Sequence, residues 1–202
     1  MKIQSIEELR AILGTPRIES TKKIYDYLNP RMLNFIEHSP LVFIATTDQD
    51  GFPTISPKGD GVGAVRALND GTLLIPERKG NKIAASFENI IHGSKVGLIF
   101  LVPGTHEALR VQGNPTIIHD AVLNKEMESL TQEALLVLKI EVDNAYFHCG
   151  KAFLRSKLWS DELEKTNLNI SFGQEIAENM SKEAPFIEDF DKGVEERYKT
   201  EL

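Results

Sequence analysis

The 202-residue sequence predicts a mainly β (α+β) fold, a small antiparallel barrel of six or so strands with flanking helices. Three observations support this prediction. Short apolar runs follow one another after residue 38, several of the turns between them are of the hairpin type, and the runs are continuously apolar. Hairpins connect antiparallel neighbours, and continuous apolar runs indicate strands that are buried on both faces.

Residues 1–37 predict helices packed on the barrel. The stretch "SIEE", residues 5–8, has the spacing of a capping box, with a hydroxyl followed three residues later by a carboxylate, and apolar positions follow it. Gly14-Thr15-Pro16 ends this first helix. A second apolar periodicity from Ile24 to Ile36 predicts one or two further short helices.

Residues 38–160 contain the strand series. "LVFIATT" and "FPTIS" flank the turn "DQDG", in which Gly51 takes the position that tolerates a positive φ. "GAVRAL" and "GTLLIPE" flank the Asp-Gly turn "NDG", "KVGLIFLV" and "ALRVQGNPTII" flank "PGTH", and "ALLVLKIEVDNAYFHC" completes the series. Between the fourth and fifth strands, "NKIAASFENIIHG" has apolar residues at helical spacing and predicts a helix within the barrel.

Composition limits the class of protein. No apolar run approaches the roughly 20 residues of a membrane-spanning helix, and acidic residues stand where an export signal needs an apolar stretch, so we expect a cytoplasmic protein. A net charge of −7 argues against a nucleic-acid partner. Residues 161–202 hold 5 basic and 12 acidic residues and predict an acidic helical extension within one structural domain. The single cysteine, Cys149, excludes an internal disulfide.

The segment "IPERKGNKIAAS" is the first candidate binding site. It follows a strand, passes through the basic turn from Arg78 to Lys82, and enters a helix. Cationic side chains and free amide groups near a helix start are the donors that a phosphate needs. A solvated surface loop is the alternative interpretation.

The segment "SPKGD", residues 56–60, favours the phosphate interpretation. Its lysine, Lys58, leaves a neighbouring hairpin strand, and turns of consecutive barrel strands can meet at one rim. Ser56 would add a hydroxyl and Lys58 a positive charge, for a phosphate or for the edge of an electron-rich ring. The sequence therefore predicts one anion site built from two basic bends.

These segments carry a resemblance to a known family. "FIATTDQDGFPTISPKGD", "TLLIPERKGNKIAASFENI", "KVGLIFLVPGTHEALRVQG" and "FHCGKAFLRSKLW", in this order, resemble the pyridoxamine 5'-phosphate oxidase-like family, and more closely its branch of predicted flavin-nucleotide-binding proteins. The resemblance runs from about Leu41 to Trp159. It implies a split β-barrel homodimer with an FMN in each of two clefts at the subunit interface.

The resemblance also implies which residues bind the FMN. The positions that match the family's flavin-binding strand and basic turn are Ser56, Pro57, Lys58, Ile75, Pro76, Arg78, Lys79, Gly80, Asn81 and Lys82. One departure concerns the substrate. Vitamin-oxidising members recognise their substrate with a C-terminal arginine and histidine grouping, whereas this chain ends in an acidic tail, which argues against pyridoxamine phosphate as its substrate.

Four further residues are candidates for the cofactor cleft. If the segment from Lys151 to Trp159 is one helix, Lys151, Arg155 and Trp159 share a face that can cover a flavin of the partner subunit. A packed terminal segment is the alternative. Arg110 and Val111 are adjacent in a strand, so their side chains point to opposite faces of the sheet. The Arg110 side chain faces either the cleft or solvent. His148 and Cys149 are adjacent and point apart, so we expect no metal site there.

The leading functional hypothesis is an FMN-dependent oxidoreductase acting on a small molecule. In it the cofactor carries the redox chemistry, no catalytic side chain is compulsory, and Lys58 is the cation expected beside the flavin. The alternative is a non-catalytic module that binds, stores or senses a flavin, a deazaflavin or haem. A third hypothesis is an interaction protein with an empty cleft.

Overall fold

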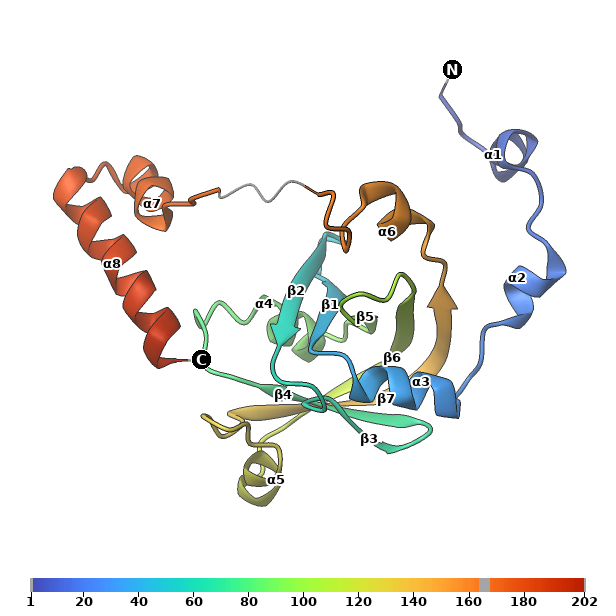
Figure 1. Cartoon of the computed structure of the whole chain (residues 1–202), viewed down its shortest axis with the longest axis horizontal. Coiled ribbons are helices and arrows are strands. Elements are labelled where there is room, and N and C mark those ends of the chain that lie inside the picture. Colours follow the sequence, from blue (N-terminus) through green and yellow to red (C-terminus); the bar gives the residue numbers. More distant parts are fainter. Residues whose placement is uncertain (1, 164–167, 202) are drawn as a thin grey trace.

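A computed structural model describes residues 2–163 and 168–201 of the chain (Figure 1). The described part forms a strand-rich body from which helices extend at both ends of the chain. Its elements, in chain order, are α1 (Ile6–Leu13), α2 (Ile18–Lys22), α3 (Pro30–Glu37), β1 (Leu41–Thr47), β2 (Pro53–Gly59), β3 (Arg66–Asn69), β4 (Thr72–Glu77), α4 (Ala85–Ile91), β5 (Val96–Leu101), β6 (Ala108–Ile118), α5 (Ala121–Glu126), β7 (Leu136–His148), α6 (Lys151–Ser156), α7 (Phe172–Met180) and α8 (Ala184–Thr200).

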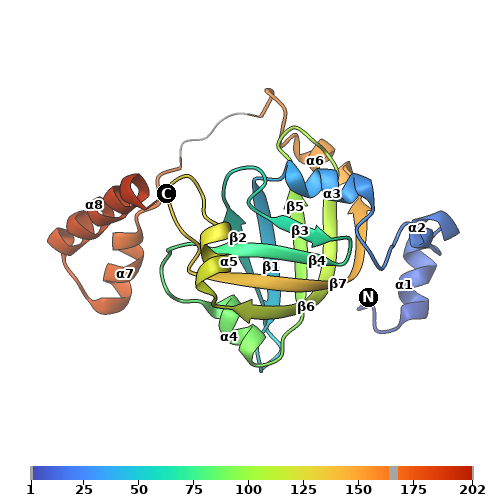
Figure 2. The ribbon, with the colours of Figure 1, turned by 90° about the horizontal axis from the view of Figure 1, so that it is seen from below.

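The strands form one antiparallel sheet in the order β2-β1-β5-β6-β7-β4-β3 (Figure 2). β2 and β3 stand at the two ends of this order, so the barrel is split between them. This confirms the predicted α+β barrel class. The expected count of six strands was one too low, because all seven apolar runs form strands, including the four-residue edge strand β3.

Alternating side chains of the strands fill the barrel. Val42 and Ile44 of β1 face inward with Leu98 and Phe100 of β5, and Phe100 is fully buried. Burial of a side chain of this size stabilises the fold by about 1.5–3 kcal/mol. The outward residues of β1 and β5 are only half-buried, so the two-sided burial expected from continuous apolar runs is incomplete within one chain.

The N-terminal helices differ in how they pack. α3 starts at Asn29, whose side chain accepts from the amides of Arg31 and Met32, and it buries Met32 and Ile36 in the barrel core. α1 starts as predicted, with the Ser5 hydroxyl accepting from the Glu8 amide at 3.1 Å. Yet neither α1 nor α2 contains a buried residue. Met32 and Ile36 thus pack α3 against the barrel, whereas the apolar side chains of α1 and α2 are exposed or, for Leu9, half-buried among the described residues.

α4 lies between β4 and β5 in sequence and is held against β1 and β2. The side-chain amide of Asn89 donates to the hydroxyls of Thr46 at 3.0 Å and Thr54 at 3.1 Å. Ile90 joins the barrel core from the same helix. These contacts fix the position of residues 78–84, the loop that leads from β4 into α4.

The chain ends in a helical hairpin of α7 and α8 that stands beside the barrel (Figures 1 and 2). α8 contains no buried residue, and α7 buries only Gly173 and Ala177. Among the described residues, no helix combines the length and the apolar character that crossing a membrane would require.

Candidate functional site

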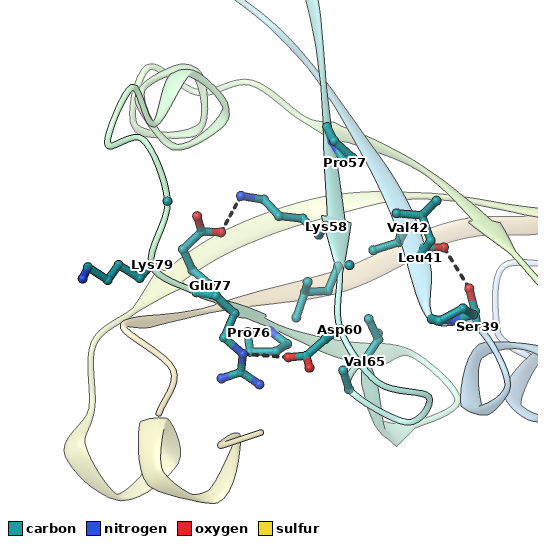
Figure 3. A pocket seen from close by; sticks show the side chains of 16 residues that line it. Ser39, Leu41, Val42, Pro57, Lys58, Asp60, Val65, Pro76, Glu77 and Lys79 are labelled. Atoms are coloured by element: carbon teal, nitrogen blue, oxygen red, sulfur yellow. Dashed lines mark hydrogen bonds and ion pairs between the residues drawn. The ribbon is translucent and has the colours of Figure 1, made fainter. Parts of the chain in front are cut away.

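The two basic bends meet at the split of the barrel (Figure 3). β2 extends to Gly59, so Ser56 and Lys58 lie on the strand itself, and their side chains share the half-buried face. β4 ends at Glu77, and the basic turn that begins with Arg78 follows at once. Both segments line one cavity of about 230 Å³ and a wider depression of about 580 Å³ beside it.

The predicted site residues of both bends line these two hollows. Ser56, Pro57, Lys58, Arg78, Gly80, Asn81 and Lys82 line the wider depression, and Pro57, Lys58, Ile75, Pro76, Arg78, Lys79 and Gly80 line the cavity. The Ile75 side chain is buried in the barrel core, so it forms part of the cavity floor. The Ser56 hydroxyl contacts the Ser86 hydroxyl of α4 at 2.8 Å, which ties the strand to the helix.

Two ion pairs cross the split. Lys58 Nζ of β2 lies 2.5 Å from Glu77 Oε2 of β4. In the bends that follow these two strands, Arg78 Nε donates to Asp60 Oδ2 at 2.7 Å. All four side chains are less than a quarter exposed. Lys58 and Arg78 are therefore each paired with a carboxylate from the other side of the split.

Sequence reasoning missed these carboxylate partners. Asp60 accepts from the Gly61 amide at 2.8 Å through Oδ1, as a cap of the following turn would. Its other oxygen binds Arg78. A signal was present in the sequence, because the polar alternation of Thr54, Ser56 and Lys58 reaches Asp60 with the same period of two.

The guanidinium of Arg78 has an unused donor. Its Nη1 is buried and finds no hydrogen-bond partner among residues 2–163 and 168–201. Buried polar atoms are normally satisfied, so an unpartnered one in a side chain that lines the cavity calls for an explanation. A phosphate oxygen is an acceptor that suits this nitrogen, and Lys58 supplies a second cation across the same cavity. The residues present thus fit a phosphorylated ligand.

The loop between β4 and α4 is constrained. Lys82 and Ala84 adopt left-handed backbone conformations, with φ of 63° and 54°. Such residues cost about 1–3 kcal/mol each and persist where the surrounding structure enforces them. Asn81 Oδ1 accepts from the Ile83 amide at 3.0 Å, and Lys79 Nζ binds Glu201 Oε1 at 2.6 Å. A hydrogen bond within the basic loop and an ion pair with Glu201 therefore both hold the loop in this conformation.

The remaining predicted residues lie elsewhere in the chain. Arg110 lines a separate groove on the outer face of β1, β5 and β6, opposite buried Val111 as the alternation predicts. α6 ends at Ser156, and Lys157 adopts a left-handed conformation, so Lys151 and Trp159 do not lie on one continuous helix. The Trp159 Nε1 donates to the Thr105 carbonyl at 3.0 Å, and its ring stacks on Phe153.

His148 and Cys149 lie at the C-terminal end of β7. His148 ends β7, and burial, together with the charges of Arg110 and Lys23, lowers its pKa below the ordinary value. Cys149 is exposed. Within residues 2–163 and 168–201, no three histidine, cysteine or acidic side chains gather as metal ligands.

Solved structures of other proteins resemble this chain. A variant of HupZ from Group A Streptococcus has 21% sequence identity and a TM-score of 0.50, over 60% of this chain and 99% of its own. A candidate pyridoxamine 5'-phosphate oxidase from Lactobacillus delbrueckii has 26% identity and a TM-score of 0.49, over 60% and 95%. An FMN-binding protein from Syntrophomonas wolfei has 13% identity and a TM-score of 0.43, over 70% and 92%. The likeness to HupZ shows the fold alone.

A family model identifies the protein family of this chain. A search of curated proteins gave no match. The family model described as pyridoxamine 5'-phosphate oxidase, in contrast, matches residues 28–149, more than half of the chain. The matched range begins just before α3, includes every strand and both basic bends, and ends after β7. The chain therefore belongs to the pyridoxamine 5'-phosphate oxidase family.

Proposed function

We propose that this protein is an FMN-dependent oxidoreductase that acts on a small molecule as a homodimer. The observation that carries the proposal is the buried Nη1 of Arg78, which lacks a partner in the described chain at the cavity where the two basic bends meet. A phosphate group supplies the missing acceptor. Membership of the family supports the same assignment.

The roles of the residues follow from their positions. Arg78 and Lys58 bind the phosphate and hold the cofactor against the split of the barrel, while Ser56 and Asn81 add hydrogen-bonding groups. Glu77 and Asp60 hold the two cations in place before the ligand arrives. Bound FMN supplies hydride and electron exchange, so the chain needs only to bind and orient the reactants.

The apolar side chains on the outer face of the barrel support the proposed homodimer. Phe43 and Ile99 are half-buried there, Ile55 is 67% exposed, and Arg110 lies among them in a groove. A largely apolar sheet face that one chain leaves open suits an interface between copies. In such a dimer the second copy contributes Arg110, Lys151, Arg155 and Trp159, in keeping with their absence from the lining of the two hollows beside the basic bends.

The binding part of the proposal is tested by titrating the purified protein with FMN and following flavin fluorescence. Arg78→Ala should weaken FMN binding by about 1.5–3 kcal/mol, because a charge-assisted contact to the phosphate is lost. Arg31→Ala removes an equally charged but exposed side chain from α3 and serves as the matched control. Equal FMN affinity in both variants would rule out this phosphate site.

The catalytic part is tested separately. Under anaerobic conditions, NADH or NADPH should bleach the flavin absorbance of the FMN-loaded protein. A flavin that binds tightly and is never bleached would remove the nicotinamide-linked enzyme and favour a storage or sensing module. If the purified protein instead has the absorbance spectrum of haem or of a deazaflavin, that molecule and not FMN is the cofactor.

A further inference from the structure

The C-terminal hairpin is a defined unit. Gly173 of α7 lies against α8 so closely that an added Cβ would stand 2.6 Å from the Ile187 carbonyl oxygen. Asp191 of α8 accepts from the Gly173 amide at 2.7 Å and from the Ser171 hydroxyl at 2.5 Å. These contacts fix how the two helices cross, so the hairpin presents a fixed surface.

The end of this hairpin is attached to the barrel beside the basic loop. Glu201 binds Lys79 Nζ at 2.6 Å through its carboxylate, and its backbone carbonyl accepts from the side-chain amide of Gln132. The two contacts join segments 122 and 69 residues apart in the sequence. They hold the end of α8 next to residues 79–83 (Figure 1).

A cleft of about 590 Å³ opens between the hairpin and this loop. Its walls are mostly apolar, and the basic loop and the hairpin both contribute to them. Ile83 comes from the loop, Ile176 from α7, and Phe190, Val194 and Tyr198 from α8. A volume of this size, with apolar walls and few polar groups, is typical of sites for small molecules.

One cation of the acidic tail faces this cleft. Arg197 lines it and stands 5.9 Å from the centre of the Phe190 ring. Among the residues that the structure describes, Arg197 forms no ion pair, whereas Lys79 at the same cleft is neutralised by Glu201. The cleft thus combines an apolar, partly aromatic wall with one available positive charge.

We propose that this cleft binds an organic anion with a flat apolar body. The body lies against Phe190 and Tyr198, and the acidic group binds the guanidinium of Arg197. Gly80, Asn81 and Ile83 line both this cleft and the depression beside the basic bends, so the two sites share one loop. A role as the substrate site of the flavin enzyme rests on the proposed function, whereas the binding itself does not.

The experiment is a fluorescence titration of the full chain with anilinonaphthalene sulfonate, an aromatic anion. The wild-type protein should show saturable binding, and Arg197→Met should weaken it about tenfold. Val194→Glu places a carboxylate in the apolar wall and should abolish it. Lys192→Met removes an exposed cation of the same helix that does not line the cleft, and it should bind as the wild type does.

The variants also decide what the probe binds. If Arg197→Met and Val194→Glu both retain wild-type affinity while their circular dichroism is unchanged, the probe binds elsewhere and the proposal is overturned. An FMN titration of the same preparations separates this result from the proposed function. A protein that binds the probe through Arg197 but does not bind FMN keeps the cleft and loses the flavin assignment.

Discussion

The barrel and the terminal helices are held by different forces. The barrel buries a continuous set of apolar side chains, among them Phe100, Leu109 and Val111, all fully buried. In contrast, α1, α2 and α8 contain no buried residue. Stability therefore resides in the barrel, where side-chain burial supports it. The terminal helices depend on local caps, a close helix crossing and a few polar contacts, and this leaves their apolar surfaces available for ligands or a second copy.

The largest expected effect is loss of core packing in the barrel. Phe100→Ala should lower the free energy of unfolding by about 3–5 kcal/mol, because it leaves a cavity at a position with no exposed surface. Leu13→Ala in α1, where the side chain is 69% exposed, should change it by less than about 0.5 kcal/mol. Urea denaturation measures both. Similar losses for the two variants would contradict the division between barrel and terminal helices.

A second prediction separates the hairpin from the barrel. Gly173→Val should force α7 and α8 apart, since the added side chain meets the Ile187 backbone. Hydrogen exchange of residues 172–200 should accelerate while the unfolding of the barrel stays unchanged. Gly193→Ala is the control within α8, and it should stabilise that helix by about 0.5–1 kcal/mol because helical alanine costs less entropy. Loss of barrel stability in Gly173→Val would show that the two regions are coupled.

A smaller effect concerns pH. The Ser171 hydroxyl and the Gly173 amide lower the pKa of Asp191 below its ordinary 3.8. Its contribution to the hairpin is therefore complete above that value and is lost as the pH falls through the depressed pKa. Asp191→Asn should weaken the hairpin at neutral pH and remove this acid sensitivity. Hydrogen exchange of residues 172–200 at several pH values measures the change, and an identical pH profile in the variant would exclude Asp191 as its source.

The same comparison explains what the sequence could predict. Hairpins were predictable because they are encoded locally, as in the turn where Gly51 takes a φ of 87°. The pairs of Lys58 with Glu77 and of Arg78 with Asp60 were not. Their members are 19 and 18 residues apart and meet only where the barrel is split. Nor did periodicity reveal that α6 ends at Ser156, because the stop is made by a left-handed lysine rather than a glycine.

Sequence patterns also could not show which apolar faces lack a partner. The periodicity of α1 and of the acidic tail predicted helices, and both are helical. Whether such a helix packs depends on a surface contributed by distant residues. That the two basic bends line one cavity was predictable, because they follow consecutive barrel segments. The carboxylates that pair with Lys58 and Arg78 were not predictable in this way.

The most direct test of the central claim compares FMN with riboflavin, which lacks the phosphate, in the wild-type protein and in Arg78→Ala. If the two basic bends bind the phosphate, the wild type should prefer FMN strongly, and the variant should lose about 10- to 100-fold in FMN affinity while its riboflavin affinity stays constant. Equal affinity for both ligands in the wild type, or an equal loss for both in the variant, would contradict the account.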